Sequence, residues 1–180
     1  MEQSDEQLMA AYRDGSVEAF DALYARHKGR LYRYVVRGVR RRAVAEELYQ
    51  EIWIRVIEAR RRYAPTARFT TWLFTIAHNR LVDHWRRKEL ALAGDGAPSE
   101  PELAGGSDAD PARQVEAREA LARFSAALEA LPPVQRDAFL LHHEAGLTAA
   151  EIASVTGSDP EAVKSRLRYA GAKLKAATDV

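Results

Sequence analysis

The sequence predicts an all-α protein with two small helical domains joined by a flexible linker. Apolar residues recur at helical spacing on both sides of residues 91–112, and no stretch shows a convincing strand alternation. Residues 91–112 are acidic and contain four glycines, three prolines and no aromatic residue, a composition typical of a linker. We therefore expect a four-helix domain at 1–90, a linker at 91–112 and a helix-turn-helix domain at 113–180.

The first domain should begin with a short helix that starts at Ser4 and ends at Gly15 and Ser16. A long helix follows, with its apolar face at Phe20, Leu23, Tyr24, His27, Leu31, Tyr34 and Val35. The third helix runs from about Ala43 to Arg60 and has a core stripe formed by Leu48, Ile52 and Val56. Its outer face is acidic and polar, with Glu46, Glu47, Gln50 and Glu51.

The fourth helix should run from near Thr70 to Lys88. Its core stripe is Leu73, Ile76, Ala77 and Leu81, and the opposite side carries Thr71, Thr75, His78, Asn79 and Arg86. The cations at its end, Arg86, Arg87 and Lys88, complement the negative end of the helix dipole and can equally contact phosphates.

The segment that joins the third and fourth helices, residues 60–70, contains four arginines and two aromatic residues. Aromatic side chains stack on unpaired bases while arginines neutralise phosphates, so this composition favours contact with single-stranded nucleic acid. The alternative is that Tyr63 and Phe69 close the edge of a small core, and we assign Trp72 to the core.

The second domain contains a helix-turn-helix pattern. Thr148 and Glu151 form a capping box at the start of one helix, and Gly157 suits the turn that ends it. Ser158 or Asp159 can cap the next helix, and Pro160 suits its first turn. The buried stripe of that helix is Val163, Leu167, Ala170 and Leu174.

The other side of this last helix is polar and cationic, with Glu161, Ser165, Arg168 and Ala172 at its centre and Lys164, Arg166, Tyr169 and Lys173 on its flanks. Such a face suits the major groove, where cations hold phosphates and Arg, Ser or Glu reach base edges. A solvated basic surface is the alternative for this helix alone. The capped helix and glycine turn that precede it favour DNA binding.

Composition limits the classes of function. The 180 residues include no cysteine, which excludes disulfides and thiolate metal sites and fits the cytoplasm. We expect neither a signal peptide nor a membrane span. The net charge is only +1, but residues 1–90 hold 18 Lys or Arg against 12 Asp or Glu, while residues 113–180 hold nine of each. No catalytic motif is present, and the adjacent His142 and His143 cannot both face one metal ion, so we expect no enzyme, metal or cofactor.

Residues 45–88, the linker and residues 131–174 together resemble the extracytoplasmic-function (ECF) group of bacterial RNA polymerase sigma factors. The resemblance implies a first domain that binds the clamp helices of the polymerase largest subunit and opens the minus-10 promoter element. It implies a second domain that reads the minus-35 element and meets the polymerase flap. An anti-sigma factor is a further implied partner.

Carried over by position, the resemblance assigns polymerase binding to Glu47, Gln50, Glu51 and Trp53. It assigns minus-10 binding to Arg61, Arg62, Tyr63, Arg68, Phe69, Thr75, His78, Asn79, Arg86 and Arg87. It assigns minus-35 binding to Glu161, Ala162, Lys164, Ser165, Arg166 and Arg168.

Two alternatives stay open at the level of sequence. One is a sigma-like decoy that sequesters a regulator without binding promoters. Such a decoy would not need the cationic surfaces of this chain. The other is a dimeric helix-turn-helix repressor, which would not need the acidic face of the third helix and for which no dimerisation heptad is evident.

Overall fold

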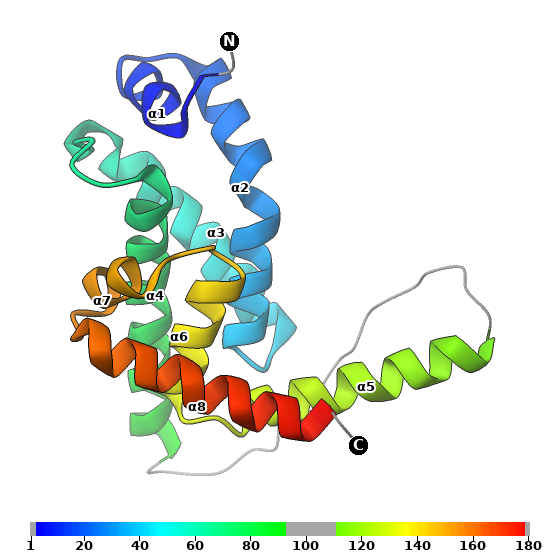
Figure 1. The fold of residues 1–180 in the computed structure, drawn as a ribbon. Coiled ribbons are helices and arrows are strands. Elements are labelled where there is room, and N and C mark those ends of the chain that lie inside the picture. The colour runs from blue at the N-terminus through cyan, green and yellow to red at the C-terminus, as the bar shows by residue number, and fades with distance from the viewer. Residues whose placement is uncertain (1–2, 93–110, 179–180) are drawn as a thin grey trace.

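In the computed structural model, residues 3–92 and 111–178 are described, and every regular element among them is a helix (Figure 1). The first domain contains α1 (Asp5–Arg13), α2 (Val17–Gly38), α3 (Arg42–Ala59), the 3-10 turn η1 (Arg60–Arg62) and α4 (Phe69–Leu92). The second contains α5 (Pro111–Glu129), α6 (Pro133–His143), α7 (Ala149–Thr156) and α8 (Pro160–Thr178). The predicted all-α fold class is confirmed.

Most of the predicted linker, residues 93–110, lies outside the described residues. Its two predicted ends are helical instead, because 91–92 complete α4 and 111–112 begin α5. Pro111 is the first residue of α5, a position where proline is favourable because the amide there has no partner within the helix.

In the first domain, α3 packs against both α2 and α4. The largest fully buried side chains of these helices are Leu23, Leu31, Tyr34, Ile52, Phe69, Leu73, Phe74 and Leu81. α2 and α4 approach closely at Gly38, where an added Cβ would lie 2.5 Å from Leu81 Cδ2. Trp85 on α4 donates from Nε1 to the Gly38 carbonyl over 3.1 Å, which closes the same junction.

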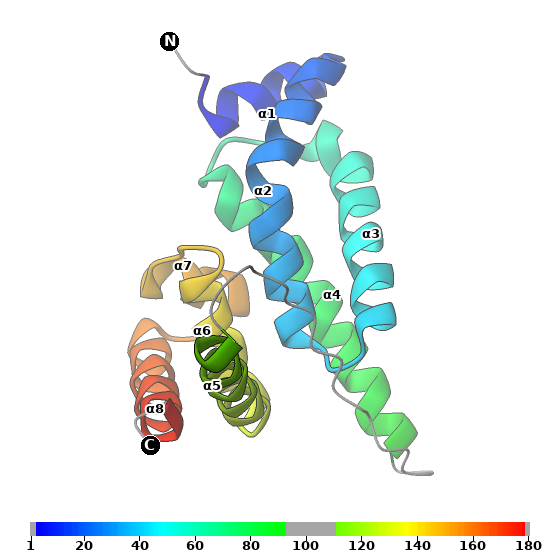
Figure 2. The same ribbon diagram turned by 90° about the vertical axis from the view of Figure 1, so that its right-hand side faces the viewer.

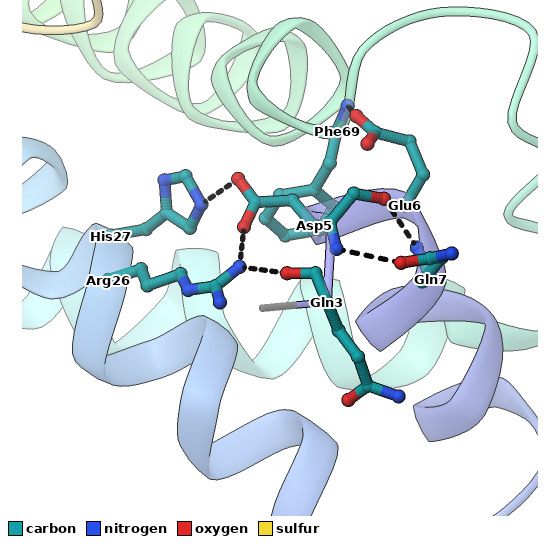
Figure 3. Close-up of polar contacts among 8 residues, drawn as sticks. Gln3, Asp5, Glu6, Gln7, Arg26, His27 and Phe69 are labelled. Carbon is teal, nitrogen blue, oxygen red and sulfur yellow. Dashed lines mark hydrogen bonds and ion pairs between the residues drawn. The ribbon is translucent and has the colours of Figure 1, made fainter. Parts of the chain in front are cut away.

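The start of α1 is tied to α2 and to the first residue of α4 by a polar network (Figure 3). Asp5 accepts a hydrogen bond from Arg26 over 2.8 Å and lies 2.7 Å from Nε2 of the buried His27. The Glu6 carboxylate accepts the Phe69 amide over 2.9 Å. Although burial opposes ionisation of Asp5, these two partners on α2 hold its pKa below the ordinary value. α1 therefore fixes the position at which α4 begins.

The second domain has the predicted helix-turn-helix geometry. The Thr148 hydroxyl accepts the Glu151 amide and the Glu151 carboxylate accepts the Thr148 amide, which completes the capping box at the start of α7. Gly157 ends α7 with φ of 63°, the left-handed conformation that glycine adopts without strain. Asp159, and not Ser158, caps α8 by accepting the amides of Glu161 and Ala162.

The two domains pack against each other (Figures 1 and 2). α7 lies against α4, and α6 lies against α2. Figure 2 shows α3 on the opposite side of α2 and α4 from the helices of the second domain. The described structure therefore places α3 and the helix-turn-helix unit on different sides of α2 and α4.

Candidate polymerase-binding and DNA-binding surfaces

The outer face of α3 is the candidate polymerase-binding surface. Glu46, Glu47 and Gln50 are exposed, and Glu51 is half-buried beside the Arg80 guanidinium, with which it forms an ion pair. Ile54 continues the same face one turn further and is 53% exposed. The surface is thus acidic and amide-bearing, with an exposed aliphatic side chain at its end.

Trp53 does not belong to this surface, contrary to the assignment carried over from the resemblance. Its side chain is buried, with the residue 6% exposed, and its ring lies 4.9 Å from the Tyr24 ring and 5.9 Å from the Phe20 ring, measured between centroids. Trp53 forms part of an aromatic cluster between α2 and α3. We therefore assign it to the core of the first domain.

Two of the carried-over minus-10 residues are also buried. Tyr63 is 3% exposed and Phe69 is fully buried, with their ring centroids 6.2 Å apart. The alternative considered for these aromatic residues, that they close the edge of the core, agrees with their position. In the described conformation neither ring is available to stack on a base.

The cationic side chains of the same region are exposed. Arg61 and Arg62 project from η1, Arg68 precedes α4, and Arg86 and Arg87 lie near the end of α4. Asn79 is exposed as well. Burial, followed by the neighbouring cations Lys88, Arg80 and Arg87, lowers the pKa of His84 on the same helix.

The polar side of α4 is covered by the second domain. His78 Nδ1 lies 2.8 Å from the Asp137 carboxylate of α6. Glu151 of α7 accepts hydrogen bonds from Thr71 and Arg68, each over 3.3 Å. Thr75, which lies between these positions, is half-buried and donates to the Thr71 carbonyl of its own helix. The structure thus places a carboxylate of the second domain beside two of the predicted minus-10 residues, Arg68 and His78, and leaves Asn79, Arg86 and Arg87 exposed.

The outer face of α8 is the candidate minus-35 surface. Glu161, Lys164 and Arg168 are exposed, while Ala162, Ser165 and Arg166 are half-buried. The Lys164 ammonium donates to Glu161 over 2.6 Å, and Arg166 donates to the Ser158 hydroxyl over 2.7 Å. All six predicted residues therefore lie on one helix, with Arg166 oriented by the turn that precedes it.

The carboxylates at the domain junction were not predicted from the sequence. Asp137 on α6 and Glu144, the C-cap residue that follows it, continue the buried stripe of Leu140 and Leu141 at the spacing of one helix face. A charged residue on an apolar stripe is rarely buried without a partner. That pattern is the signal that could have identified them, although it does not say where the partners lie.

Among residues 3–92 and 111–178, no helix is long and apolar enough to cross a membrane. The same part of the chain holds no group of three or more His, Cys, Asp or Glu side chains arranged for a metal ion.

Two family models match the chain: Sigma-70 region 2 over residues 23–90 and Sigma-70, region 4 over residues 121–174. The chain is 34% identical over 169 residues to RNA polymerase sigma factor CarQ of Myxococcus xanthus, which covers 93% of each chain. It is 32% identical over 183 residues to RNA polymerase sigma factor CnrH of Cupriavidus metallidurans, with 99% of this chain and 96% of the relative covered. ECF RNA polymerase sigma factor SigK of Mycobacterium tuberculosis is 31% identical, with coverage of 90% and 87%.

Solved structures of sigma factors also resemble this chain. CnrH in complex with the cytosolic domain of CnrY matches with a TM-score of 0.73 and 25% identity over 98% of both chains. The sigma factor RpoE of Bartonella quintana, in complex with the anti-sigma factor NepR, shares the fold with a TM-score of 0.76, at 20% identity over 91% of this chain and 99% of RpoE. With both family regions in order on one chain and relatives matching over nearly its whole length, this protein belongs to the sigma-70 family of bacterial RNA polymerase sigma factors, in the extracytoplasmic-function group.

Proposed function

We propose that this sigma factor binds core RNA polymerase through the exposed face of α3 and directs it to promoters that have a minus-10 and a minus-35 element. The observation that carries the proposal is the pairing of regions 2 and 4 on one chain with an uncovered cationic helix, α8. No repressor needs the first of these regions, and a decoy needs no cationic helix.

The α3 face suits a basic coiled coil such as the clamp helices of the polymerase. Glu47 and Gln50 are exposed and lie almost one helical turn apart, so both can reach the same partner helix. Opposite charges steer association and fix its register, and the exposed Ile54 adds apolar area beside them. Substituting Glu47 and Gln50 together by alanine should weaken polymerase binding while leaving the circular dichroism spectrum unchanged, because neither side chain is buried. Asp21→Ala, an exposed change on α2, is the control.

The minus-10 element would be bound by the exposed arginines of η1 and α4 and by the polar side of α4. Arginines neutralise phosphates without regard to sequence, while the amide of Asn79 can pair with the exposed edge of an unstacked base. Holding such a base out of the duplex would favour strand opening. Because Tyr63 and Phe69 are buried, the phosphate contacts and Asn79 carry this proposal rather than aromatic stacking.

The minus-35 element would be read by α8 in the major groove. Lys164 and Arg168 are exposed and suit phosphates or guanine edges, and Arg166 lies in the second turn of the helix, where it donates to the Ser158 hydroxyl of the preceding turn. Lys164 is paired with Glu161, so DNA must compete with that carboxylate for the ammonium.

Two further parts of the proposal rest on relatives. Solved structures of CnrH with CnrY and of RpoE with an anti-sigma factor support an anti-sigma partner for this chain. Its place of action would be the cytoplasm, where core polymerase and the chromosome meet. The polymerase would supply the chemistry of RNA synthesis, and this chain would contribute promoter recognition and strand opening.

Reconstituted transcription tests the proposal. Core RNA polymerase and fragmented genomic DNA from the source bacterium would be incubated with and without the purified chain, and the transcript starts would be sequenced. We expect chain-dependent starts downstream of a shared two-part element. If a polymerase shown to be active gave no such starts, the decoy hypothesis would replace this one.

A further inference from the structure

A cationic cavity lies where α2, α4 and α6 meet. Its volume is about 150 Å³, well above the ~10–15 Å³ that one water molecule requires. The charged and titratable side chains that line it are Arg40, His84, Lys88 and Arg136, and no Asp or Glu is among the described residues of its lining. A concave site with several donors and no carboxylate suits a small anion.

Local geometry brings these side chains together. His84, Trp85 and Lys88 lie within about one turn of α4, and Arg136 lies in the first turn of α6. The Trp85 indole donates from Nε1 to the Gly38 carbonyl over 3.1 Å, which fixes its ring as one wall of the cavity. The same hydrogen bond satisfies the carbonyl at the end of α2, so this oxygen is less repulsive to an anion.

Arg136 is the lining residue that most lacks a partner. A guanidinium carries five N–H donors. Among the described residues, the Arg136 side chain has no hydrogen bond or ion pair, and its Nε is buried. The guanidinium lies over the Trp85 ring, 5.8 Å from the centroid, and a ring face accepts no more than a fraction of these donors. Because a buried donor without an acceptor is unfavourable, an anion in the cavity would stabilise this side chain.

The carboxylates nearest to Arg136 do not balance its charge. Burial, and after it the positive charge of Arg40, lowers the pKa of Arg136, while Glu129 and Asp137 oppose the shift. Glu129 forms an ion pair with Arg40 over 3.3 Å, and Asp137 accepts the Tyr34 hydroxyl over 2.7 Å. Both carboxylates are thus already engaged, and neither lines the cavity.

The α4 side of the cavity adds further positive charge. Lys88 is exposed and has no hydrogen bond or ion pair within the part of the chain that the structure describes. His84 is half-buried, and burial, followed by Lys88, Arg80 and Arg87, lowers its pKa. An anion beside His84 would counter these cations and favour the protonated ring, which would then be another donor. The exposure of Lys88 leaves the mouth of the cavity open to solvent.

We propose that this cavity binds a terminal phosphate group, either inorganic phosphate or the phosphomonoester of a small molecule, through Lys88, Arg136 and Arg40. A phosphomonoester carries a charge of about −1.5 to −2 near neutral pH and three acceptor oxygens, which match several separate donors. Arginine binds such a group through paired N–H donors, and lysine binds it as a point charge. The proposal does not rest on polymerase or promoter binding, because none of these three residues is assigned to either.

The size of the cavity favours a terminal phosphate over a nucleic acid backbone. Pockets for drug-sized ligands measure about 300–1,000 Å³, so 150 Å³ encloses one phosphate group and leaves the rest of a larger molecule outside. A phosphodiester has one negative charge, two unesterified oxygens and a nucleoside on each side. Both nucleosides would have to pass through the mouth of the cavity for its phosphate to reach Arg136.

A bound phosphate would be held by both domains. Arg40 and Lys88 belong to the first domain, and Arg136 belongs to the second. A ligand that binds one arrangement of the chain stabilises that arrangement by mass action. Phosphate should therefore strengthen the packing of α6 against α2 and make the two domains unfold more nearly together.

Inorganic phosphate is the first probe, and the indole N–H of Trp85 is the reporter. The full chain has three tryptophans, so a ¹⁵N-labelled sample gives three indole signals, and Trp85→Phe identifies the one at the cavity. Adding phosphate at constant pH and ionic strength should move the Trp85 signal along a saturable curve and leave the signals of Trp53 and Trp72 in place. A linear drift, or equal movement of all three signals, would refute the site.

Two substitutions test the cations separately. Arg136→Met keeps an unbranched side chain against Trp85 but removes the donors, and it should weaken phosphate binding by about tenfold or more. Lys88→Gln changes an exposed residue and should weaken binding by about threefold, so the test stands even if Arg136→Met does not fold.

Arg118→Gln is the matched control. Arg118 on α5 is exposed and has no hydrogen bond or ion pair among the described residues, so its substitution removes the same charge away from the cavity. Phosphate affinity should be unchanged in this variant. Wild-type affinity in Lys88→Gln and in folded Arg136→Met would overturn the proposal.

Other anions define the chemical class of the ligand. Acetate offers a single carboxylate, and a dinucleoside monophosphate offers one phosphodiester without a terminal phosphate. Neither should give a saturable shift of the Trp85 signal, and a response to either that equals the response to phosphate would contradict a terminal-phosphate site. Adenosine monophosphate distinguishes the two sources. Tighter binding than inorganic phosphate assigns the site to phosphorylated metabolites, and weaker binding assigns it to the free ion.

Urea denaturation tests whether phosphate joins the two domains. Phosphate stabilises proteins in general because it is excluded from their surface, so variants are compared at the same phosphate concentration. The rise in the urea midpoint should be larger for the wild type and Arg118→Gln than for Arg136→Met or Lys88→Gln. An equal rise in all four would be the general salt effect alone and would count against a site shared by both domains.

Discussion

Gly157→Ala tests whether the turn of the helix-turn-helix unit depends on backbone conformation alone. Gly157 has φ of 63°, and an added Cβ would meet no heavy atom within 4 Å. The substitution therefore introduces no clash, and its cost is the left-handed backbone, about 1–2 kcal/mol for a residue that carries a Cβ. Alanine also restricts the unfolded chain, which returns about 0.4–1 kcal/mol. We expect the free energy of unfolding to fall by about 1 kcal/mol.

Gly171 supplies a matched control in the same domain. It lies inside α8, and a Cβ there would also meet nothing within 4 Å, but its backbone is helical. Glycine in a helix interior is roughly 0.5–1 kcal/mol less stable than alanine, so Gly171→Ala should stabilise the domain by about that amount. Substitution of glycine by alanine should thus lower the free energy of unfolding at Gly157 and raise it at Gly171, although neither site is crowded.

The assay is urea denaturation of the full chain followed by far-ultraviolet circular dichroism, with hydrogen exchange of the α7 and α8 amides to locate the effect. Trp53 and Trp72 lie within the first domain and Trp85 lies on α4 against the Arg136 guanidinium of the second domain, so tryptophan fluorescence follows the first domain and its junction with the second. Protection of α7 and α8 should fall in Gly157→Ala and rise in Gly171→Ala.

A neutral or stabilising effect of Gly157→Ala would refute the reasoning, because it would mean that the turn relaxes to a right-handed conformation without cost. A destabilising effect of Gly171→Ala would show instead that α8 has an unrecognised close neighbour at this position. If the urea midpoint followed by tryptophan fluorescence fell with Gly157→Ala and rose with Gly171→Ala, the two domains would unfold as one unit.

Three other predictions follow from local contacts. Gly38→Ala should destabilise the first domain by about 1–3 kcal/mol in urea, because its Cβ would force Leu81 out of its rotamer. The pKa of Asp5 in the folded protein lies below its ordinary 3.8, so its stabilising contribution is complete above pH 3.8 and is lost as pH falls through the lower, folded pKa. Asp5→Asn should remove this contribution near neutral pH. When the urea midpoint is measured at a series of pH values, the variant should lose less stability than the wild type as the pH falls into the acid range. Arg166→Ala should weaken binding to promoter DNA by about 1–3 kcal/mol without changing affinity for core polymerase, and an unchanged minus-35 preference in a binding-site selection would contradict its role.

Short-range signals in the sequence predicted much of the fold. The capping box of Thr148 and Glu151, the left-handed Gly157 and the apolar stripe of α8 are each determined within a few residues, and each appears in the structure. The helices of the first domain begin and end within a few residues of the predicted positions for the same reason. At Ser158 and Asp159, where two caps were possible, only the three-dimensional geometry selects Asp159.

The contacts between the domains could not be predicted from the sequence. Tyr34 and Asp137 are 103 positions apart, and Arg33 and Glu144 are 111 apart, so no local periodicity relates them. Burial of Trp53 and Tyr63 could not be predicted from the apolar periodicity either, because an aromatic residue at the edge of a helix or loop can lie in the core or on a contact surface. The sequence shows which residues of a candidate site are charged, but it does not show which of them form ion pairs with distant residues in the folded protein.

The net charge of only +1 results because the excess of cations in residues 1–90, 18 Lys or Arg against 12 Asp or Glu, is offset by residues 91–112, which hold five Asp or Glu and no Lys or Arg. The excess of cations lies in residues 1–90, and the carboxylates that pair with it across the junction lie in the second domain. A phosphate backbone that displaced Glu151 from Arg68 would gain an existing cation and leave an acidic group free. Added salt weakens both the closed junction and the DNA contact, since both depend on the same charges.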